Sequence, residues 1–378
     1  MSEALEAIAD RFHPRERITA IRALGSGNVN ETFLVTHEGT YQGGQNGAFV
    51  MQRLNTSVFE RPDLVMRNLV ALGEHVQRRL ASPPPELSGR RWEVPRVVPC
   101  RQQSHWVEHN GQFWRSISYI GAATTTDVIR GNDHAREVGY GLGMFHSLIS
   151  DLPANDLADT LENFHVTPTY LNRYDDVLSG QVIDPSDALL NQACAFVEAR
   201  RVGIDVLESA LARGELQHRP IHGDPKINNV MIDESTGQAV GLIDLDTVKP
   251  GLIHYDIGDC LRSCCNPAGE EAENPEEAHF DIALCEAILG GYLKVARGFL
   301  SDWDLHYLPD CIRLIPLELG LRFLTDHLEG DVYFRSDAPG HNLRRAAVQF
   351  QLTKSIEAQL PAIRALVQDL TAPQTSPF

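Results

Sequence analysis

Three polar residues near the middle of the sequence have types and spacing suited to phosphoryl transfer. Asp224 is followed five residues later by Asn229, and Asp244 comes directly after the apolar run 239–243. A carboxylate and an amide oxygen suit Mg²⁺, which keeps several waters and takes its other ligands from phosphates. A further carboxylate close to the metal can orient an attacking hydroxyl or accept its proton. These are the groups that transfer of a phosphoryl group to a hydroxyl requires.

A predicted β-hairpin brings two of these residues together. Two apolar runs, 230–232 and 239–243, flank a segment that is rich in turn-forming residues. Residues that face each other across an antiparallel hairpin have a constant sum of residue numbers. A turn centred just after Thr236 therefore pairs Asn229 with Asp244, so we expect the amide to lie beside the carboxylate at the open end of the hairpin.

The catalytic stretch resembles a known superfamily. The motif His222-Gly223-Asp224-x-x-x-x-Asn229, followed by Ile243-Asp244-Leu245, is similar to the catalytic loop and metal-binding motif of the aminoglycoside/choline/homoserine kinases. Within that superfamily the sequence most resembles the N-acetylhexosamine 1-kinases, which are anomeric sugar kinases. The blocks that carry this resemblance are 222–229, 242–251, 255–259 and 321–334.

The resemblance implies an ATP- and Mg²⁺-dependent small-molecule kinase with the protein-kinase-like fold. It implies that Asp224 is the catalytic base and that Asn229 and Asp244 are the metal ligands. It also implies that His222 and Asp256 brace the catalytic loop.

A glycine-rich segment near the N-terminus resembles the loop that covers the ATP phosphates in this superfamily. Glycine there lets backbone N–H groups approach a phosphate closely. The candidate nucleotide contacts of this segment are Gly25, Ser26, Gly27, Asn28, Asn30 and Thr32. The resemblance places the adenine-binding hinge at Ser118, Tyr119 and Ile120.

The third strand departs from the usual pattern of the fold. Protein-kinase-like folds carry a phosphate-binding lysine on this strand, whereas this sequence offers Gln52 or Arg53. Because side chains alternate along a strand, only one of the two can enter the cleft. The helix that Pro62 opens carries no clear acid to pair with such a residue.

The acceptor is assigned by the same resemblance. Arg322 and Tyr333, eleven residues apart, keep the spacing of two sugar contacts in the sugar kinases, and Asp224 and Lys226 complete the expected substrate-binding set. Lys226 is alternatively a solvated loop cation, and Arg322 and Tyr333 are alternatively structural. Two other functions stay open: a kinase for an aminoglycoside, choline, ethanolamine or homoserine, and a nucleotide-binding protein without turnover.

The order of predicted elements indicates an α+β fold with two lobes. Residues 1–120 read mostly as antiparallel strands, among them the segments 94–98 and 114–120, plus the helix 62–80. They form the expected nucleotide-binding lobe. Residues 121–378 read as a mainly helical lobe with the catalytic loop and the acceptor site. The helices expected in it are 134–150, 184–213, 278–299, 307–329 and 341–370. A cleft between two lobes is a common place for a ligand.

The amino-acid composition argues against two classes of binding partner. The sequence has 33 Lys and Arg against 51 Asp and Glu, a net charge of −18, which disfavours nucleic acid and anionic membranes. Its acidic N-terminus is unlike a signal peptide, so we expect a cytoplasmic protein, monomeric or homodimeric. The 7 cysteines read as small core residues rather than as a disulfide framework or a metal site.

Overall fold

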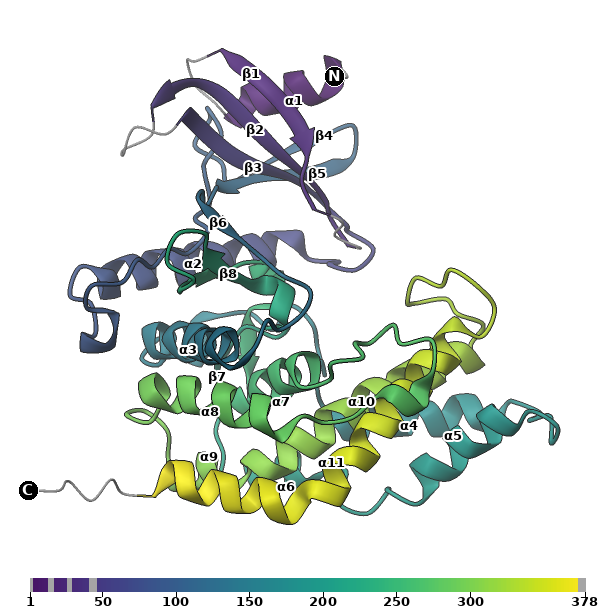
Figure 1. Ribbon diagram of the computed structural model, residues 1–378. Helices are drawn as coiled ribbons and strands as arrows, with labels where there is room; N and C mark the ends of the chain where they lie inside the picture. Colours follow the sequence, from purple (N-terminus) through teal and green to yellow (C-terminus); the bar gives the residue numbers. More distant parts are fainter. Residues whose placement is uncertain (1–2, 13–16, 26–28, 41–45, 373–378) are drawn as a thin grey trace, which may run out of the picture.

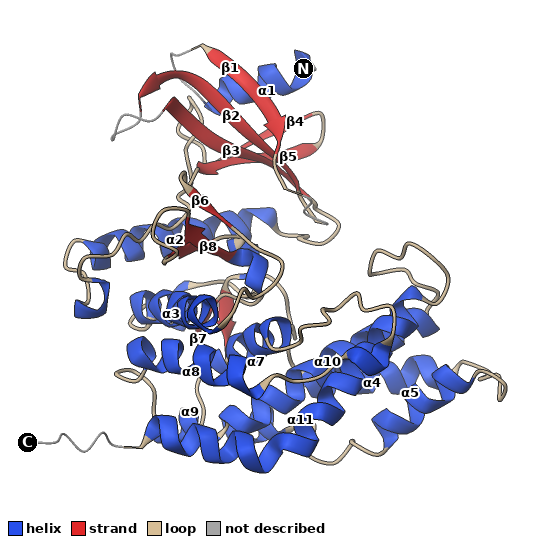
Figure 2. Ribbon diagram, viewed as in Figure 1, coloured by secondary structure: helices blue, strands red, loops and turns tan. Residues whose placement is uncertain are grey.

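The computed structural model describes residues 3–12, 17–25, 29–40 and 46–372. A β-sheet lies at one end of the molecule, and the helices form the larger part beneath it (Figures 1 and 2). The predicted α+β fold, with a β-rich N-terminal region and a mainly helical C-terminal part, is confirmed. Within the described residues, no helix is long and apolar enough to cross a lipid bilayer.

The N-terminal sheet is five-stranded and antiparallel, in the order β1-β2-β3-β5-β4. Its strands are β1 (Ile18–Ala23), β2 (Glu31–Thr40), β3 (Asn46–Leu54), β4 (Trp106–His109) and β5 (Gln112–Ser118). The segment 94–98, expected as a strand, forms only an isolated bridge between Val97 and Ile117.

The two faces of this sheet bury different side chains. Met51 and Trp114 pack with Ile8 and Phe12 of helix α1 (Glu3–Phe12), which covers one face. Leu54 belongs instead to the main core, together with Val65 and other residues of helix α2 (Pro62–Leu80). Alternation along β3 therefore turns every second side chain toward the helical part of the molecule.

The helical part is built around the packing of α3 (Asn132–Ile149) against α8 (Ile282–Ala296). The two backbones approach so closely that a Cβ on Gly139 would lie 1.9 Å from the Ile288 carbonyl oxygen, so this position requires glycine. The remaining helices are α4 (Thr167–Ser179), α5 (Ala188–Glu198), α6 (Val206–Ala212), α7 (Ile253–Cys264), α9 (Asp302–His306), α10 (Leu308–Leu328) and α11 (His341–Thr371).

Most expected helices lie within a few residues of their predicted bounds, with two differences. The segment 184–213 is interrupted at residues 199–205 and forms α5 and α6, and α4, α7 and α9 were not among the expected helices. The cysteines are free thiols, and Cys194 is half-buried while the other six are buried, as the core interpretation requires.

Two small sheets accompany the large one. Strands β6 (Ala123–Thr124), β8 (Val230–Asp233) and β9 (Ala239–Leu242) form one, with β8 in the middle. Strands β7 (Arg219–Ile221) and β10 (Lys249–Gly251) pair to form the other. The stretch that carries Asp224, Asn229 and Asp244 therefore runs from β7 through the β8–β9 hairpin to β10.

Candidate active site

The loop that carries Asp224 is held by a buried carboxylate beneath it. Asp256, on α7, accepts hydrogen bonds from the backbone N–H groups of His222 (2.7 Å) and Gly223 (2.8 Å). Its Oδ2 also lies 2.8 Å from Nε2 of the buried His146. Asp256 is fully buried, so these contacts replace the water that an ionised carboxylate needs. The expected role of Asp256 as a brace fits these contacts.

The His222 ring is a structural part of the same loop. Its Nε2 lies 3.0 Å from the Ile243 carbonyl oxygen, and its Nδ1 accepts a hydrogen bond from the Asp224 N–H at 3.3 Å. Burial lowers the pKa of His222, which matches a neutral ring that donates through one nitrogen and accepts through the other. His222 therefore fastens the loop to the end of the hairpin.

Gly223 allows the loop to pass close to the segment between Asp244 and β10, which contains Thr247. Its φ is +88°, and a Cβ there would lie 2.6 Å from the Thr247 carbonyl oxygen. The Thr247 hydroxyl donates to the His222 carbonyl oxygen at 2.7 Å, which holds the two segments together. Only glycine fits this crossing without strain.

Asp224 lies beside two of the other predicted site residues. Its Oδ2 is 2.7 Å from Lys226 Nζ, and Asn229 Nδ2 donates to the Asp224 carbonyl oxygen at 2.8 Å. Burial opposes the charge of Lys226, but the Asp224 carboxylate outweighs it and raises the lysine pKa. Lys226 is therefore paired with Asp224 and is not a freely solvated cation.

The expected hairpin register is wrong by one residue. Val230 pairs with Leu242, and the Ile243 N–H donates to the Asn229 carbonyl oxygen at 2.9 Å, so Asn229 faces Ile243 rather than Asp244. The turn is centred one residue earlier than predicted, and the Asp233 carboxylate accepts hydrogen bonds from the backbone N–H groups of Ser235 and Thr236 at its tip. A bulge after Met231 then shifts the pairing again.

Asp244 lies one step beyond the hairpin, in the left-handed conformation with φ of 62°. Its carboxylate has no hydrogen-bond or ion-pair partner in the part of the chain that the structure describes. Burial of the carboxylate, followed by repulsion from the carboxylates of Asp246 and Asp224, raises the pKa of Asp244 to about 7. An unpaired acid held among other acids is a position where a cation would be stabilised.

These side chains fit a hard divalent cation. The Asn229 amide nitrogen is engaged with Asp224, which leaves its Oδ1 as an acceptor, and the Asp244 carboxylate is unengaged among the described residues. Among those residues, no group of three or more His, Cys, Asp or Glu side chains could hold a metal ion. One carboxylate and one amide suit an ion that completes its shell with water and phosphate.

The predicted phosphate loop is only partly described. Ser26, Gly27 and Asn28 lie outside the described residues, and Gly25 has a φ of +74°. The Asn30 side chain donates to Asp246 Oδ2 at 2.6 Å, and Thr32 accepts a hydrogen bond from Gln52 at 3.1 Å. The ends of this segment therefore reach toward the loop that follows Asp244.

On β3, Gln52 enters the cleft and Arg53 does not. Gln52 lines a small cavity of about 20 Å³ together with Asp244, Asp246 and Arg115. Arg53 forms an ion pair with Glu31 on the other face of the sheet. A cavity of this size is too small for a nucleotide, so nucleotide binding there requires the sheet and the Asp244 loop to separate.

Sequence reasoning missed two residues of this cleft. Arg115 on β5 and Asp246 form an ion pair at 2.5 Å, and each side chain is only 2% exposed. The strand that contains Arg115 was predicted, but its pairing with β3, which gives Arg115 its face, could not be known from one sequence. The spacing of Asp246, two residues after Asp244, was the only signal in the sequence for the second residue.

The expected hinge follows directly from the sheet. Ser118 ends β5, where its N–H donates to the Arg96 carbonyl oxygen at 2.8 Å. Tyr119 and Ile120 then lead to β6, and the buried Ile120 packs against Met231 and other hairpin residues. This segment therefore connects the large sheet with the hairpin, as a hinge between lobes must.

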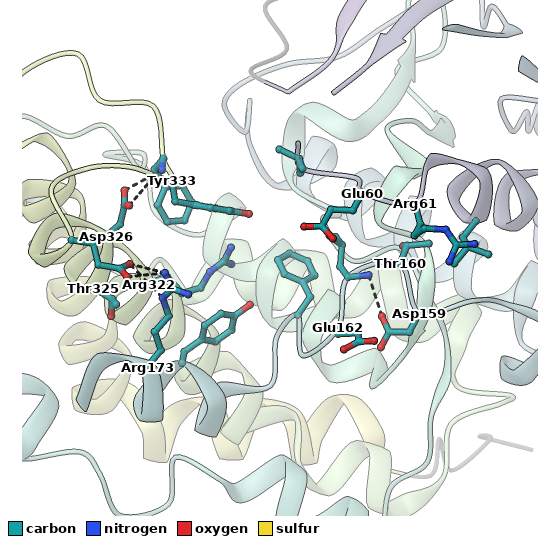
Figure 3. Close-up of a pocket in the computed structure, with 17 residues that line it drawn as sticks. Glu60, Arg61, Asp159, Thr160, Glu162, Arg173, Arg322, Thr325, Asp326 and Tyr333 are labelled. Atoms are coloured by element: carbon teal, nitrogen blue, oxygen red, sulfur yellow. Dashed lines mark hydrogen bonds and ion pairs between the residues drawn. The ribbon is translucent and has the colours of Figure 1, made fainter. Parts of the chain in front are cut away.

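A second, larger cavity contains the predicted acceptor contacts. It has a volume of about 610 Å³ and lies between α10, the loop that follows α10 and the segment 159–164. Arg322 and Tyr333 lie on one side of it and Glu60 and Glu162 on the other (Figure 3). Asp224 and Lys226 are not among its lining residues, so the predicted substrate-binding set is divided between this cavity and the catalytic loop.

The two acceptor candidates are firmly positioned. Arg322 lies among the rings of Phe164 (5.1 Å) and Tyr170 (5.0 Å), with its guanidinium 3.9 Å from Glu318. The loop that carries Tyr333 is fastened by Asp326, whose carboxylate accepts hydrogen bonds from three successive backbone N–H groups, 332–334. The Tyr333 side chain itself is 65% exposed.

A buried histidine connects this cavity with the catalytic loop. His165 Nε2 lies 2.9 Å from the Gly223 carbonyl oxygen, and its Nδ1 lies 3.0 Å from Glu318 Oε1. The Gly223 carbonyl oxygen can only accept a hydrogen bond, so Nε2 carries a proton and donates to it. Burial opposes a positive charge on the ring, but Glu318 raises the pKa of His165.

Comparisons with known proteins agree with this architecture. The model of the phosphotransferase enzyme family (APH) matches residues 20–296. An aminoglycoside phosphotransferase from Alicyclobacillus acidocaldarius is similar over 96% of both chains, with a TM-score of 0.57 and 17% identity. A choline kinase from Cryptosporidium parvum is similar over 93% of this chain and 92% of its own, with a TM-score of 0.56 and 13% identity.

A third similar structure is the ADP-bound aminoglycoside phosphotransferase APH(2'')-Ib. It is similar over 94% of this chain and 99% of its own, with a TM-score of 0.50 and 13% identity. At these identities, the solved structures show a shared fold.

Proposed function

Because the chain belongs to the phosphotransferase enzyme family, we propose that it transfers the γ-phosphoryl group of ATP to the anomeric hydroxyl of an N-acetylhexosamine or a related sugar. The observation that carries the reaction type is the position of Asp224. Its carboxylate is partly accessible on a loop fixed by Asp256, and Asn229 donates a hydrogen bond to the same loop. Asp244, which has no partner among the described residues, is near enough to interact electrostatically with the Asp224 carboxylate. In this proposal Asp224 orients the acceptor hydroxyl and accepts its proton as the oxygen attacks the γ-phosphorus.

The metal site follows from the same residues. Asn229 Oδ1 and the Asp244 carboxylate would hold Mg²⁺, which when bound neutralises the charge of the phosphate chain. Lys226, paired with Asp224, places a positive charge near the transferred group. The ADP-bound relative supports ATP as the donor.

Arg322 and Tyr333 support the sugar as acceptor. Arg322 presents guanidinium donors to a cavity bordered by aromatic rings, an arrangement that suits a polar ring with an apolar face. The spacing of Arg322 and Tyr333 resembles that of the sugar kinases. Lobe closure would have to bring this cavity and the Asp224 carboxylate onto one acceptor.

A second candidate acceptor is a cationic amino alcohol, such as an aminoglycoside or choline. Glu60 and Glu162 line the same cavity and have no hydrogen-bond or ion-pair partner among the described residues. Unpaired acids attract a cation, and the similar structures include an aminoglycoside phosphotransferase and a choline kinase. This acceptor class keeps the same donor and the same catalytic residues.

One assay separates these functions. Purified protein is incubated with ATP, Mg²⁺ and a panel of free sugars, aminoglycosides and amino alcohols, and ADP release is measured. ADP release that depends on an N-acetylhexosamine, with an acid-labile and alkali-stable phosphate product, supports anomeric transfer. Release only with cationic acceptors favours the second candidate, and ATP binding without turnover for any acceptor favours a non-catalytic nucleotide-binding protein.

Asp224→Asn tests the assigned base. The variant should lose turnover and retain ATP binding, because the amide keeps the shape of the side chain and cannot accept the proton. Asp281→Asn is the matched control, since Asp281 caps helix α8 and lies in a different part of the fold. Normal turnover by Asp224→Asn would show that Asp224 is misassigned.

A further inference from the structure

The nucleotide cleft contains a buried cation that the third strand does not supply. Gln52, the β3 residue that enters the cleft, is uncharged, and Arg53 is paired with Glu31 on the other face. The charge comes from Arg115 on the neighbouring strand β5, whose side chain is 2% exposed. Burying a guanidinium so completely is costly unless partners or a ligand balance it.

The pairing of β3 with β5 places this charge beside the position of the usual lysine. Gln52 and Arg115 are direct partners in the sheet, so their side chains share one face and start from Cβ atoms about 5 Å apart. Arg115 Nε and Nη2 donate to Gln52 Oε1 at 2.9 and 2.7 Å. Gln52 in turn donates to Thr32, at the end of the glycine-rich segment. The cation is thus one strand away from β3 and connected to it.

Asp246 holds the other side of the guanidinium. Its Oδ1 lies 2.5 Å from Arg115 Nη1, and its Oδ2 accepts the 2.6 Å hydrogen bond from Asn30. Asp246 is two residues after Asp244, and both border the same small cavity as Arg115. The guanidinium is therefore fixed next to the carboxylate proposed to bind Mg²⁺.

Arg115 also has donors to spare. A guanidinium carries five N–H groups, and two of them donate to Gln52. The Nη1 group forms an ion pair with Asp246 but has no hydrogen-bond partner within the described part of the chain. A buried arginine with unengaged donors on a cavity wall is suited to a planar, multiply charged acceptor such as a phosphate.

We propose that Arg115 is the phosphate-binding cation of this cleft and that Asp246 positions it. This assignment rests on the proposed function, because it takes the cleft between the sheet and the Asp244 loop as the ATP site. When the sheet and this loop separate to admit ATP, the unengaged Arg115 donors face the phosphate chain. The acid that pairs with this cation comes from the Asp244 loop, so the cation needs no acid from the helix after Pro62.

Nucleotide binding measured by calorimetry tests this role without relying on turnover. Dissociation constants for ATP, ADP and adenosine are compared in the wild type, Arg115→Gln and the control Arg53→Gln. Arg115→Gln should weaken ATP and ADP binding about 10- to 100-fold, the loss expected for one or two charge-assisted hydrogen bonds, and change adenosine binding less than about twofold. Arg53→Gln should leave all three constants close to wild type.

A transposed variant keeps the test decisive if Arg115→Gln folds poorly with Asp246 unpaired. Gln52→Lys combined with Arg115→Gln returns the cation to β3 and keeps the charge near Asp246. This double variant should fold and bind ATP within about tenfold of wild type, since only the strand that carries the charge changes.

Two results would overturn the assignment while leaving the proposed function intact. One is an Arg115→Gln protein that keeps the wild-type preference for ATP over adenosine, and the other is a folded transposed variant that has lost this preference. Absence of ATP binding by the wild type would instead refute the proposed function, and this assignment with it.

Discussion

Replacing Asp256 by asparagine should loosen the catalytic loop from below. The carboxylate accepts two backbone N–H groups and faces His146, all within 2.8 Å. A hydrogen bond to a charged group contributes about 1.5–3 kcal/mol, and asparagine keeps one of the two acceptor oxygens. We therefore expect Asp256→Asn to lower the free energy of unfolding by about 2–5 kcal/mol, the loss of one or two such hydrogen bonds.

Urea unfolding and steady-state kinetics measure the two consequences. The variant should unfold at lower urea and should lose kcat more than 10-fold, because Asp224 directly follows the two backbone N–H groups that the carboxylate fixes. Its affinity for ATP should change little. Asp281→Asn, which exchanges another backbone-capping aspartate for a residue that caps equally well, should alter stability by less than about 1 kcal/mol and leave kcat unchanged. An Asp256→Asn protein with wild-type unfolding and kcat would refute the bracing argument.

Three further substitutions test other parts of the structure. Burial raises the pKa of Glu208 to about 7, so the folded state favours the neutral carboxyl group. The stability that this neutral group contributes is lost as pH rises from about 5 through 7. Glu208→Gln should therefore stabilise the protein by up to about 2 kcal/mol at pH 8.5 and hardly at all at pH 5, measured by urea unfolding at both pH values. Gly223→Ala should cost about 1–2 kcal/mol for its positive φ, add a clash with the Thr247 carbonyl and reduce kcat, whereas a normal kcat would contradict the tight crossing. Glu318→Gln should both raise the KM of the acceptor and lower kcat, and it should leave the KM of ATP unchanged, because Glu318 contacts both His165 and Arg322. A change in only the acceptor KM or only kcat would argue against this shared role.

The contact between Asp224 and Asn229 could be predicted from the sequence because the two residues are close along the chain. Asp224 and Asn229 lie on one loop whose length fixes their separation, and the structure shows them in hydrogen-bond contact. The order of helices and strands that makes an α+β fold could also be predicted from the sequence, because hydrophobic periodicity and proline positions are local signals. Their roles in catalysis and metal binding stay predictions.

The hairpin register shows where local reading becomes insufficient. The turn was placed correctly, but its centre depended on side-chain hydrogen bonds from Asp233 that a composition of turn residues does not reveal. A bulge after Met231 compensates part of the shift. An error of one residue reverses which face a side chain takes, so Asn229 was paired with the wrong partner even though the hairpin itself was right.

The cleft cation could not be predicted because it depends on contacts between distant segments. Arg115 obtains its direction from the pairing of β5 with β3, and it obtains its counter-charge from Asp246, more than a hundred residues later in the chain. An inspection of β3 alone finds no cation that enters the cleft, because the cation is carried by the neighbouring strand β5. What constrains the site is the charge at one point in space, and two paired strands offer two backbone positions from which a side chain can deliver it. The apparent loss of the lysine at Gln52 is therefore no argument against nucleotide binding.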